Sequence, residues 1–184
     1  MPSGGANPRA LGVSAALDHL LRCTRSTMAP HCHLSQATGS ETNGARDEAH
    51  RISSASPCVV GAHAVAFHGH PRYTGDIDLF VRRTVENAAR IVAVLEEFGF
   101  GGAGADESTF LEPDQVIQLG RPPNRIDLLT GISGVAFDEA WPDRDHAEWD
   151  GIRVPILGRR HLLANKRASG RPKDLADLEE LNEG

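Results

Sequence analysis

The chain has 184 residues, of which 40% are hydrophobic and 24% are charged, and its formal net charge is -6. This length suits one domain of ordinary size and is short for two. The negative charge argues against a protein that binds nucleic acid through its overall charge. No apolar run approaches the roughly 18 residues that a membrane helix needs. The composition therefore predicts a soluble, single-domain protein that has no membrane partner.

The cysteines indicate a reducing compartment. Cys23, Cys32 and Cys58 are odd in number and irregularly spaced, so they predict neither a disulfide framework nor a CxxC zinc site. The apolar stretch LGVSAAL is cut short by Asp18 and lacks the length of a secretory signal. We therefore expect a cytoplasmic protein. An organelle transit peptide is the less favoured alternative, because Asp18 is the only acidic residue among the first 40.

Two segments of different texture divide the chain. Residues 1–56 are rich in Ser, Gly, Ala, Thr and Asn and show no sustained period beyond a short helical stretch near residues 15–22. We expect this segment to be poorly specified, with disorder as one interpretation. From Pro57 onward, apolar runs alternate with Gly, Pro and charged turns, which is typical of a mixed α/β domain. The chemistry is therefore expected in residues 57–184.

The first expected elements of this domain surround a glycine and end in a long helix. CVVG is a short buried strand ending at Gly61, AHAVAFHG a helix that begins directly after it, and RYTGDIDLFV a second strand. TVENAARIVAVLEEFGF is the clearest helix, with Thr84 as its N-cap and Gly99 as its stop. Its apolar residues at helical spacing are Ala88, Ile91, Val92, Leu95 and Phe98.

The rest of the domain is expected to contain a hairpin, a further strand and two helices. The prolines of RPPN exclude helix between the strands QVIQLG and RIDLLT, so these strands are expected to pair as a hairpin. GIRVPIL is another strand. RRHLLANKRA and KDLADLEEL are expected to be helices broken at Gly170 and Pro172.

Two aspartates on the second strand are candidate metal ligands. Side chains alternate along a strand, so Asp76 and Asp78 share one face while Ile77, Leu79 and Val81 anchor the other. Two residues of strand rise place the carboxylates roughly 7 Å apart at the backbone, close enough to reach one cation. Magnesium prefers such oxygen ligands together with water and phosphate. The structural alternative is that acids on an edge strand prevent edge-to-edge aggregation.

A third acid and a glycine turn extend this pattern. In RIDLLT, Asp127 faces away from Ile126 and Leu128, so a neighbouring strand can deliver it to the same place. Three acids can hold two cations, which stabilise the attacking and leaving oxygens of a phosphoryl transfer. Gly61 lies between a strand and a helix N-terminus, where backbone N–H groups favour phosphate, although packing alone explains such a glycine equally well.

Taken together, these motifs resemble the DNA polymerase beta-like nucleotidyltransferases. The segments VVGAHAVAFHGHPRYTGDIDLFV, RPPNRIDLLTGISG and HLLANKRASGRPKDLADLEEL are similar to a small bacterial group related to the AbiEii-type toxins of toxin–antitoxin and phage-abortive systems. The resemblance covers residues 57–182. It implies the polymerase beta-like fold, an α/β (α+β) domain with a small mixed sheet and flanking helices.

The resemblance also implies roles for individual residues. Asp76 and Asp78 would bind Mg²⁺, with Mn²⁺ as an alternative ion, and Asp127 would complete the cluster and activate the acceptor hydroxyl. Gly61 would let the triphosphate of an NTP approach the backbone. Ala62 departs from the serine of the family's Gly-Ser form, so that only backbone donors remain there.

A second group of implied residues lies near the C-terminus. Lys166 matches a lysine that pairs with triphosphate, Asp174 matches an acid near that site, and Arg171 adds a charge-assisted phosphate contact. The structural alternative for all three is a solvated helix face with i,i+4 pairs. A further departure is that residues 1–56 lack the amphipathic helix that such domains place before the first strand.

The expected function is transfer of a nucleoside monophosphate from an NTP to an acceptor hydroxyl with release of pyrophosphate. RNA such as tRNA, a protein hydroxyl or a small molecule is the expected acceptor. The preference for RNA, and a toxin role with a cognate antitoxin partner, follow from the resemblance alone. The alternative is a weakly active or inactive binding module, or an antitoxin, that keeps this fold; Ala62 and the segment 1–56 motivate it.

Histidines suggest a third alternative, a zinc-binding regulator. His63 and His68 are five residues apart, an angle of about 140° on a helix, so they do not share a face as i,i+4 ligands would. HCH at residues 31–33 has no partners at zinc-finger spacing. Trp141 and Trp149 flank an acidic segment and are expected to anchor packing rather than to stack on bases.

Overall fold

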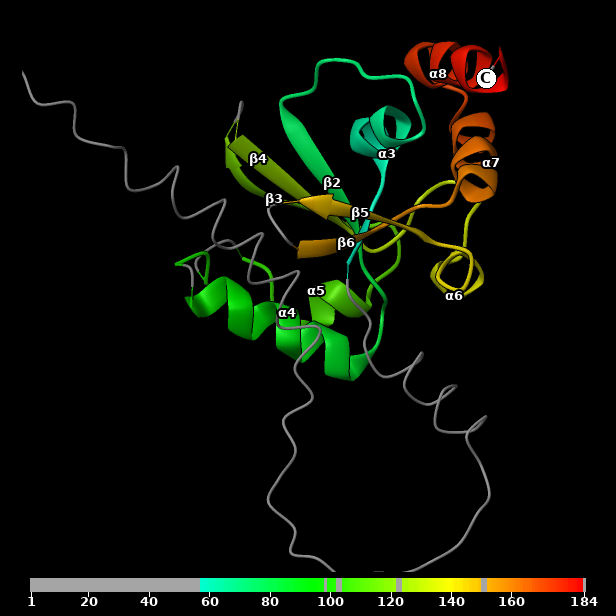
Figure 1. Cartoon of the computed structure of the whole chain (residues 1–184). Helices are drawn as coiled ribbons and strands as arrows, with labels where there is room; N and C mark the ends of the chain where they lie inside the picture. The colour runs from blue at the N-terminus through cyan, green and yellow to red at the C-terminus, as the bar shows by residue number, and fades with distance from the viewer. Residues whose placement is uncertain (1–56, 98, 102–103, 122–123, 150–151, 184) are drawn as a thin grey trace, which may run out of the picture.

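The computed structural model describes residues 57–97, 99–101, 104–121, 124–149 and 152–183, which form one mixed sheet with helices around it (Figure 1). The sheet has six strands in the order β3-β4-β2-β1-β6-β5. Their bounds are β1 Cys58–Val59, β2 Asp76–Phe80, β3 Val116–Arg121, β4 Asn124–Leu129, β5 Asp145–Trp149 and β6 Ile152–Ile156. The expected fold class, α/β with a small mixed sheet and flanking helices, is confirmed.

Strand directions are mixed in a way that places β2 beside β4. β2 and β4 are parallel, as are β1 and β6, whereas β1 and β2 are antiparallel. β3 and β4 form the hairpin expected from the turn at residues 121–124, and β5 and β6 form a second hairpin. The two acidic motifs therefore lie on neighbouring strands in the interior of the sheet order. They are not on edge strands, which removes the anti-aggregation explanation for them.

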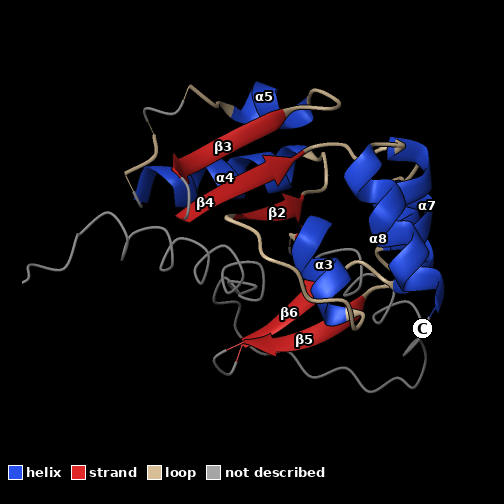
Figure 2. Ribbon diagram, turned by 90° about the horizontal axis from the view of Figure 1, so that it is seen from above, coloured by secondary structure: helices blue, strands red, loops and turns tan. Residues whose placement is uncertain are grey.

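Helices cover both faces of this sheet. Their bounds are α3 Gly61–Phe67, α4 Val85–Glu97, α5 Glu107–Leu111, α6 Phe137–Ala140, α7 Arg159–Ser169 and α8 Pro172–Glu183. α4 and α5 lie on one side of the sheet, and α3 lies on the other with the pair α7–α8 beside it (Figures 1 and 2).

The helix expected at residues 84–100 is present as α4, with the expected ends. The amide of Asn87 donates to Thr84 Oγ1 at 3.3 Å, so Thr84 is the N-cap. At the other end Gly99 has a φ of 77°, the left-handed conformation that ends many helices. Val94 is buried although it was not among the apolar residues assigned to the stripe, and Phe98 lies outside the described residues.

Three short elements were not predicted, and one strand is shorter than predicted. α5, α6 and β5 are absent from the predicted set; β5 has the sequence DHAEW, which has neither strict alternation nor strand-forming composition. β2 begins only at Asp76, so residues 72–75 of the predicted strand are loop. Arg72 in that loop pairs with Asp177 of α8, a tertiary contact that joins the loop to this helix.

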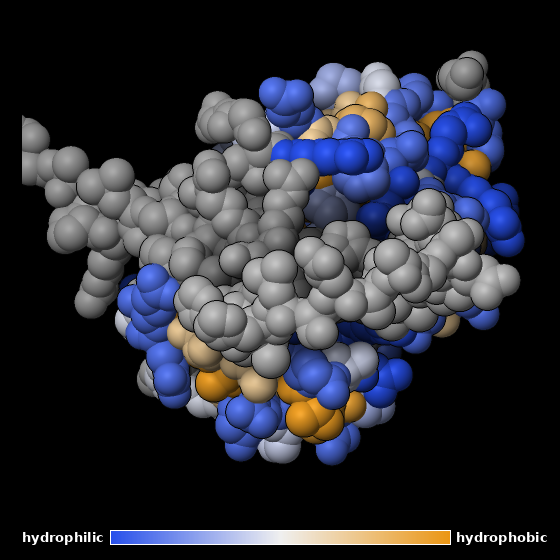
Figure 3. Space-filling view, turned by 60° about the horizontal axis from the view of Figure 1, so that its bottom comes forward, coloured by the Kyte–Doolittle hydropathy of each residue, from blue (hydrophilic) through white to orange (hydrophobic). Residues whose placement is uncertain are grey.

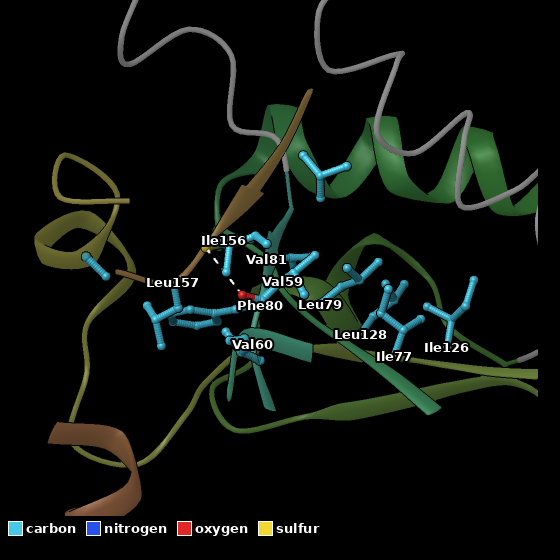
Figure 4. Close-up of a cluster of buried hydrophobic side chains, with 14 of the residues drawn as sticks. Val59, Val60, Ile77, Leu79, Phe80, Val81, Ile126, Leu128, Ile156 and Leu157 are labelled. Carbon is cyan, nitrogen blue, oxygen red and sulfur yellow. Dashed lines mark hydrogen bonds between the residues drawn. The ribbon is translucent and has the colours of Figure 1, made fainter. Parts of the chain in front are cut away.

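The core lies where the short strand β1 joins the two halves of the sheet (Figure 4). Val59 pairs with Leu79 on one side and Ile156 on the other, and all three side chains are fully buried. The amide of Leu157 donates to the carbonyl of Val59 at 2.9 Å and extends this pairing. Apolar burial on both sides lets a strand of two residues hold its place in the sheet.

The described residues expose few large apolar side chains. On the face drawn in Figure 3, hydrophilic residues predominate among the coloured residues. The large exposed apolar residues come from separate elements: Phe67, Tyr73, Val85, Leu111, Val116 and Leu175. Among the helices that the structure describes, none combines the length and the apolar character needed to cross a bilayer.

Several expectations fall outside the described residues. These are the texture of residues 1–56, the short helix near residues 15–22, Cys23, Cys32 and the HCH motif at residues 31–33. Cys58, which is described, is a free and buried thiol in β1. Burial raises the pKa of this thiol to about 12, so it stays protonated and unreactive.

Candidate functional site

The parallel register of β2 and β4 brings the three predicted aspartates together. Asp78 is paired directly with Asp127, and Asp76 is paired with Arg125. Because alternate residues share a face, all four side chains project from the same side of the sheet. Their neighbours Ile77, Leu79, Ile126 and Leu128 are buried on the other side. A third carboxylate from a neighbouring strand, expected from the spacing of RIDLLT, is thus present beside Asp78.

Arg125 is the residue of this cluster that the sequence analysis missed. Its guanidinium forms an ion pair with the carboxylate of Asp76. It also contacts Asp127 twice, with Nη2 at 3.0 Å from Oδ2 and Nε at 2.9 Å from Oδ1. The positive charge therefore lies between two of the three acids. The signal was available, because Arg125 is two residues before Asp127 and must share its face.

Asp76 is held ionised by its neighbours. The hydroxyl of Thr74 donates to Asp76 Oδ1 at 2.5 Å. This hydrogen bond, followed by the charges of Arg125 and Lys173, lowers the pKa of Asp76 despite some burial. Asp76 therefore carries a negative charge at neutral pH.

Asp78 is the member of the cluster whose negative charge is disfavoured by its surroundings. Burial raises the pKa of Asp78, and the negative charges of Asp76 and Asp127 raise it further. The opposing charges of Lys166 and Arg125 only partly offset this effect. Asp78 thus lies where additional positive charge would stabilise its ionised form.

Gly61 makes room for the Asp78 carboxylate at the start of α3. A Cβ built at Gly61 would overlap Oδ2 of Asp78 and would lie 2.9 Å from its Cγ. Gly61 also has a φ of 61°, which side chains other than glycine rarely adopt. Position 61 therefore needs glycine for its backbone conformation and for space. These two requirements explain the glycine without a contact to phosphate. Ala62, the next residue, is buried in α3.

The three aspartates have the ligand chemistry that suits a divalent cation, but with Asp76 and Asp127 in ion pairs with Arg125 they do not form a metal site. Among the described residues, no group of three or more His, Cys, Asp and Glu side chains is disposed to hold a metal ion as it stands. The donors are nevertheless the hard oxygens that Mg²⁺ prefers. The Asp127 side chain is only 8% exposed, and its Oδ1 accepts no hydrogen bond from the described residues. Arg125 neutralises this oxygen only by an ion pair that lacks hydrogen-bond alignment.

Lys166 and Asp174, predicted to contact substrate, belong to a buried ion-pair network beside the cluster. Lys166 Nζ lies 2.6 Å from Asp174 Oδ1 and 2.7 Å from Asp177 Oδ2. Asp177 also accepts two bonds from Arg72, at 2.8 and 3.0 Å. Lys166 and Asp177 are almost completely buried. This network joins α7, α8 and the loop before β2, and the sequence analysis assigned no role to Arg72 or Asp177.

The two acids of this network are ionised. Burial raises the pKa of Asp174 and of Asp177, but hydrogen bonds and positive charges outweigh it and leave both pKa values below the ordinary range. For Asp174 the partners are Lys166 and Ser169, whose hydroxyl donates at 2.6 Å; for Asp177 they are Arg72 and Lys166. Arg171, by contrast, is exposed at the turn between α7 and α8.

The histidines of α3 have different neighbours, and so do the tryptophans. The ring of His63 packs edge-on against Trp149 at 5.9 Å, while His68 Nε2 lies 2.9 Å from the carbonyl of Leu157. Burial lowers the pKa of His63. Trp141 is buried, stacks on Phe137 at 5.3 Å and lies under the guanidinium of Arg144. Trp141 therefore anchors packing, as expected.

Comparison with known proteins adds little to this geometry. No protein-family model and no curated protein sequence matches the chain. One similar solved structure is described as that of a "putative nucleotidyltransferase" from Thermotoga maritima. It is 18% identical to this chain. The match covers 76% of this chain and 91% of the other, with a TM-score of 0.46. A functional conclusion must therefore come from the residues of the chain itself.

Proposed function

We propose that this protein is a magnesium-dependent nucleotidyltransferase of the DNA polymerase beta-like type. The observation that carries the proposal is the direct pairing of Asp78 with Asp127 on parallel strands, with Asp76 on the same face. Two acids on one strand and one on its neighbour, next to a glycine that a strand–helix turn requires, are the elements of that family's motif. The assignment to the family rests on this motif.

The three acids would have different parts in the reaction. Asp76, Asp78 and Asp127 would bind Mg²⁺, or Mn²⁺ in its place, and the bound ion would neutralise charge on the phosphates of the NTP. The acceptor hydroxyl oxygen forms a bond to the α-phosphorus, and the bond from that phosphorus to the bridging oxygen breaks. Pyrophosphate leaves with that oxygen. Asp127 is the candidate to take the hydroxyl proton.

The C-terminal residues would contribute in unequal ways. Arg171 is exposed and has the fork of donors that suits phosphate, so it is the outer phosphate contact in this proposal. Lys166 and Asp174 are paired with each other and mostly buried. Lys166 acts on Asp78 through its charge, and it would need to exchange a partner before it could reach triphosphate. Ala62 would leave only backbone donors beside Gly61.

The acceptor and the cellular role are proposed from the resemblance to AbiEii-type proteins. We propose RNA, such as tRNA, or a protein hydroxyl as the acceptor, and a cytoplasmic toxin with a cognate antitoxin as the setting. Incubating the purified chain with each labelled NTP, Mg²⁺ and total RNA or protein would identify the acceptor by the molecule that becomes labelled.

The decisive experiment removes the acidic pair. Changing Asp76→Asn and Asp78→Asn together should abolish label transfer, while circular dichroism shows that the fold is retained. Asp138→Asn is the matched control, because Asp138 is an exposed aspartate in α6 that pairs with Arg82 away from the cluster. Label transfer that persists in the double variant at the wild-type rate would exclude the proposed site.

A second candidate function is a binding module or antitoxin that keeps the fold without turnover. The pairing of Arg125 with Asp76 and Asp127 favours it, because these acids are already partly neutralised. Under this alternative the purified chain binds an NTP or a partner protein but transfers no label with Mg²⁺ or Mn²⁺. Calorimetric NTP binding measured beside the transfer assay separates the two functions.

A further inference from the structure

Arg125 places a positive charge in the middle of the acidic cluster. The side chain projects from β4 on the same face as Asp127 and opposite Asp76 in the register. It contacts both acids, and its side chain is 24% exposed, so it is partly accessible to solvent. A cation that is fixed at this point competes directly with any other cation for the same oxygens.

We propose that Arg125 is a displaceable internal counter-ion, which neutralises the acidic cluster in the resting protein and leaves it when a divalent cation binds. This inference rests on the proposed function, because it concerns the same cation site. Arg125 thereby sets the concentration of divalent ion at which the site fills. It is a positioning residue and does not itself contact the reacting atoms.

The charge balance of the cluster supports displacement over permanent pairing. Three carboxylates face one guanidinium, so the pair of strands carries an excess of negative charge even with Arg125 in place. Arg125 forms ion pairs with Asp76 and Asp127 and acts on Asp78 through its charge, and the Asp127 oxygen Oδ1 receives no hydrogen bond from the described residues. A doubly charged ion among the three acids would neutralise more of this charge than Arg125 does.

Release of Arg125 is feasible because its side chain is partly exposed, although it pairs with Asp76 and with the buried Asp127. Partly exposed ion pairs contribute modestly, since water and salt screen them and the side chain gains rotamer freedom when it leaves. The long aliphatic stem lets the guanidinium reach solvent while the backbone of β4 stays paired. Strand β4 itself is held by both neighbours, β2 and β3, so no backbone movement is required.

Metal binding by the full chain tests the proposal without an activity assay. Mn²⁺ is titrated into wild-type protein and into Arg125→Gln, and free Mn²⁺ is followed by electron paramagnetic resonance. We expect the Arg125→Gln variant to bind with a dissociation constant roughly tenfold lower, since an internal competitor held by charged hydrogen bonds is removed. Arg125→Lys keeps the charge and should stay near the wild-type affinity.

A second measurement follows the wild-type protein and does not need Arg125→Gln, in case that variant fails to fold. In ¹H–¹⁵N NMR spectra of arginine side chains, the Arg125 Nε signal is assigned by its loss in Arg125→Lys. Saturation with Mg²⁺ should shift this signal toward the position of a solvated guanidinium. An Arg125 signal that does not move at saturating Mg²⁺ would overturn the proposal.

The outcomes separate this inference from the function on which it rests. If both proteins bind Mn²⁺ with equal affinity, Arg125 is not a competitor and only the inference fails. If neither protein binds Mn²⁺ at millimolar concentrations, both the inference about Arg125 and the proposed magnesium-dependent function fail. Binding that is lost when Asp76→Asn and Asp78→Asn are introduced into either protein locates the ion at the cluster.

Discussion

Gly61 and Asp78 lie so close together that no side chain fits at position 61. A Cβ there would overlap Oδ2 of Asp78 and lie 2.9 Å from its Cγ. The glycine turn between β1 and α3 and the acidic motif of β2 are therefore one structural unit. The sequence suggested Gly61 as a phosphate contact, but in the structure this glycine leaves the space that the Asp78 carboxylate occupies.

Replacing Gly61 with alanine should destabilise the protein and displace Asp78. Two effects combine, because alanine at a φ of 61° is strained and its Cβ collides with the carboxylate. Gly170→Ala is the matched control, since Gly170 has a φ of 62° but open space around it. We expect Gly170→Ala to cost about 1–2 kcal/mol and Gly61→Ala to cost about 1–3 kcal/mol more, measured by urea unfolding.

Equal losses in the two glycine variants would mean that only backbone strain matters at position 61. The contact between Gly61 and Asp78 would then have no energetic consequence. A larger loss for Gly61→Ala that disappears when Asp78→Ala is added would confirm the contact directly, because the double variant removes the colliding group.

Asp78→Asn should raise stability at neutral pH while it removes the proposed activity. The pKa of Asp78 is raised above its ordinary 3.8, so the folded protein holds this proton more tightly than the unfolded chain. This contribution is fully present below the unfolded pKa and is lost as pH rises through the folded pKa. An amide does not ionise and escapes the loss, so the melting temperature should rise by roughly a few degrees near neutral pH.

The pH dependence distinguishes this electrostatic effect from a packing effect. The difference in melting temperature between Asp78→Asn and wild type should shrink as pH falls from neutral towards the ordinary value of 3.8, because protonation of wild-type Asp78, whose pKa is raised, removes its charge. A difference in melting temperature that stays constant between neutral and acid pH would contradict the proposal that ionised Asp78 destabilises the folded protein.

Asp177→Asn should strongly destabilise the protein, because it breaks the ion-pair network between α7, α8 and the loop before β2. Lys166 and Arg72 each lose a carboxylate partner, and Lys166 stays almost completely buried. Loss of one partner from a buried pair costs about 3–5 kcal/mol. The exposed pair of Arg160 with Asp143 is the control, and Arg160→Gln should cost no more than about 1 kcal/mol. Chemical denaturation measures both.

The same network predicts the acid limb of the stability curve. Asp174 and Asp177 have pKa values below the ordinary 3.8, so their contribution is present above that value and is lost as pH falls through the folded values. Wild-type protein should therefore lose stability steeply below a pH of about 4, and Asp177→Asn less steeply. Parallel acid limbs would show that Asp177 does not drive acid unfolding.

Thr74→Val should raise the pKa of Asp76. The hydroxyl of Thr74 donates to Asp76 Oδ1, and this bond is the largest influence lowering that pKa. Valine keeps the shape but removes the donor. A carboxyl ¹³C titration measures the change, with Thr109→Val as the control because Thr109 donates to Asp106 in α5 instead. An unchanged Asp76 titration would assign the shift to Arg125 and Lys173.

The alternation of side chains made the acidic face predictable. Asp76 and Asp78 alternate with Ile77 and Leu79, which allows only one arrangement on a half-buried strand. The same holds for Asp127 between Ile126 and Leu128. The turn residues at 121–124 likewise implied the hairpin that pairs β4 with β3. Local periodicity, which depends only on neighbouring residues, was sufficient for these elements.

Contacts between distant residues were not predictable from local pattern. Arg72 and Asp177 are 105 residues apart, and their pairing depends on how α8 packs beside the loop before β2. Lys166 looked like a helix-surface lysine available to phosphate, yet packing buries it between two aspartates. Side chains with several possible partners are assigned only when the tertiary fold brings one partner close.

By itself, the sequence determined the α/β class, the acidic faces of two strands and the ends of α4, since each follows from side-chain alternation, helical period or turn chemistry within a few residues. Only the tertiary structure decided that β2 lies parallel to β4 with Asp78 beside Asp127, and that Arg125 neutralises Asp76 and Asp127. Register and ion pairing depend on the packing of strands far apart in the chain, which no local pattern specifies.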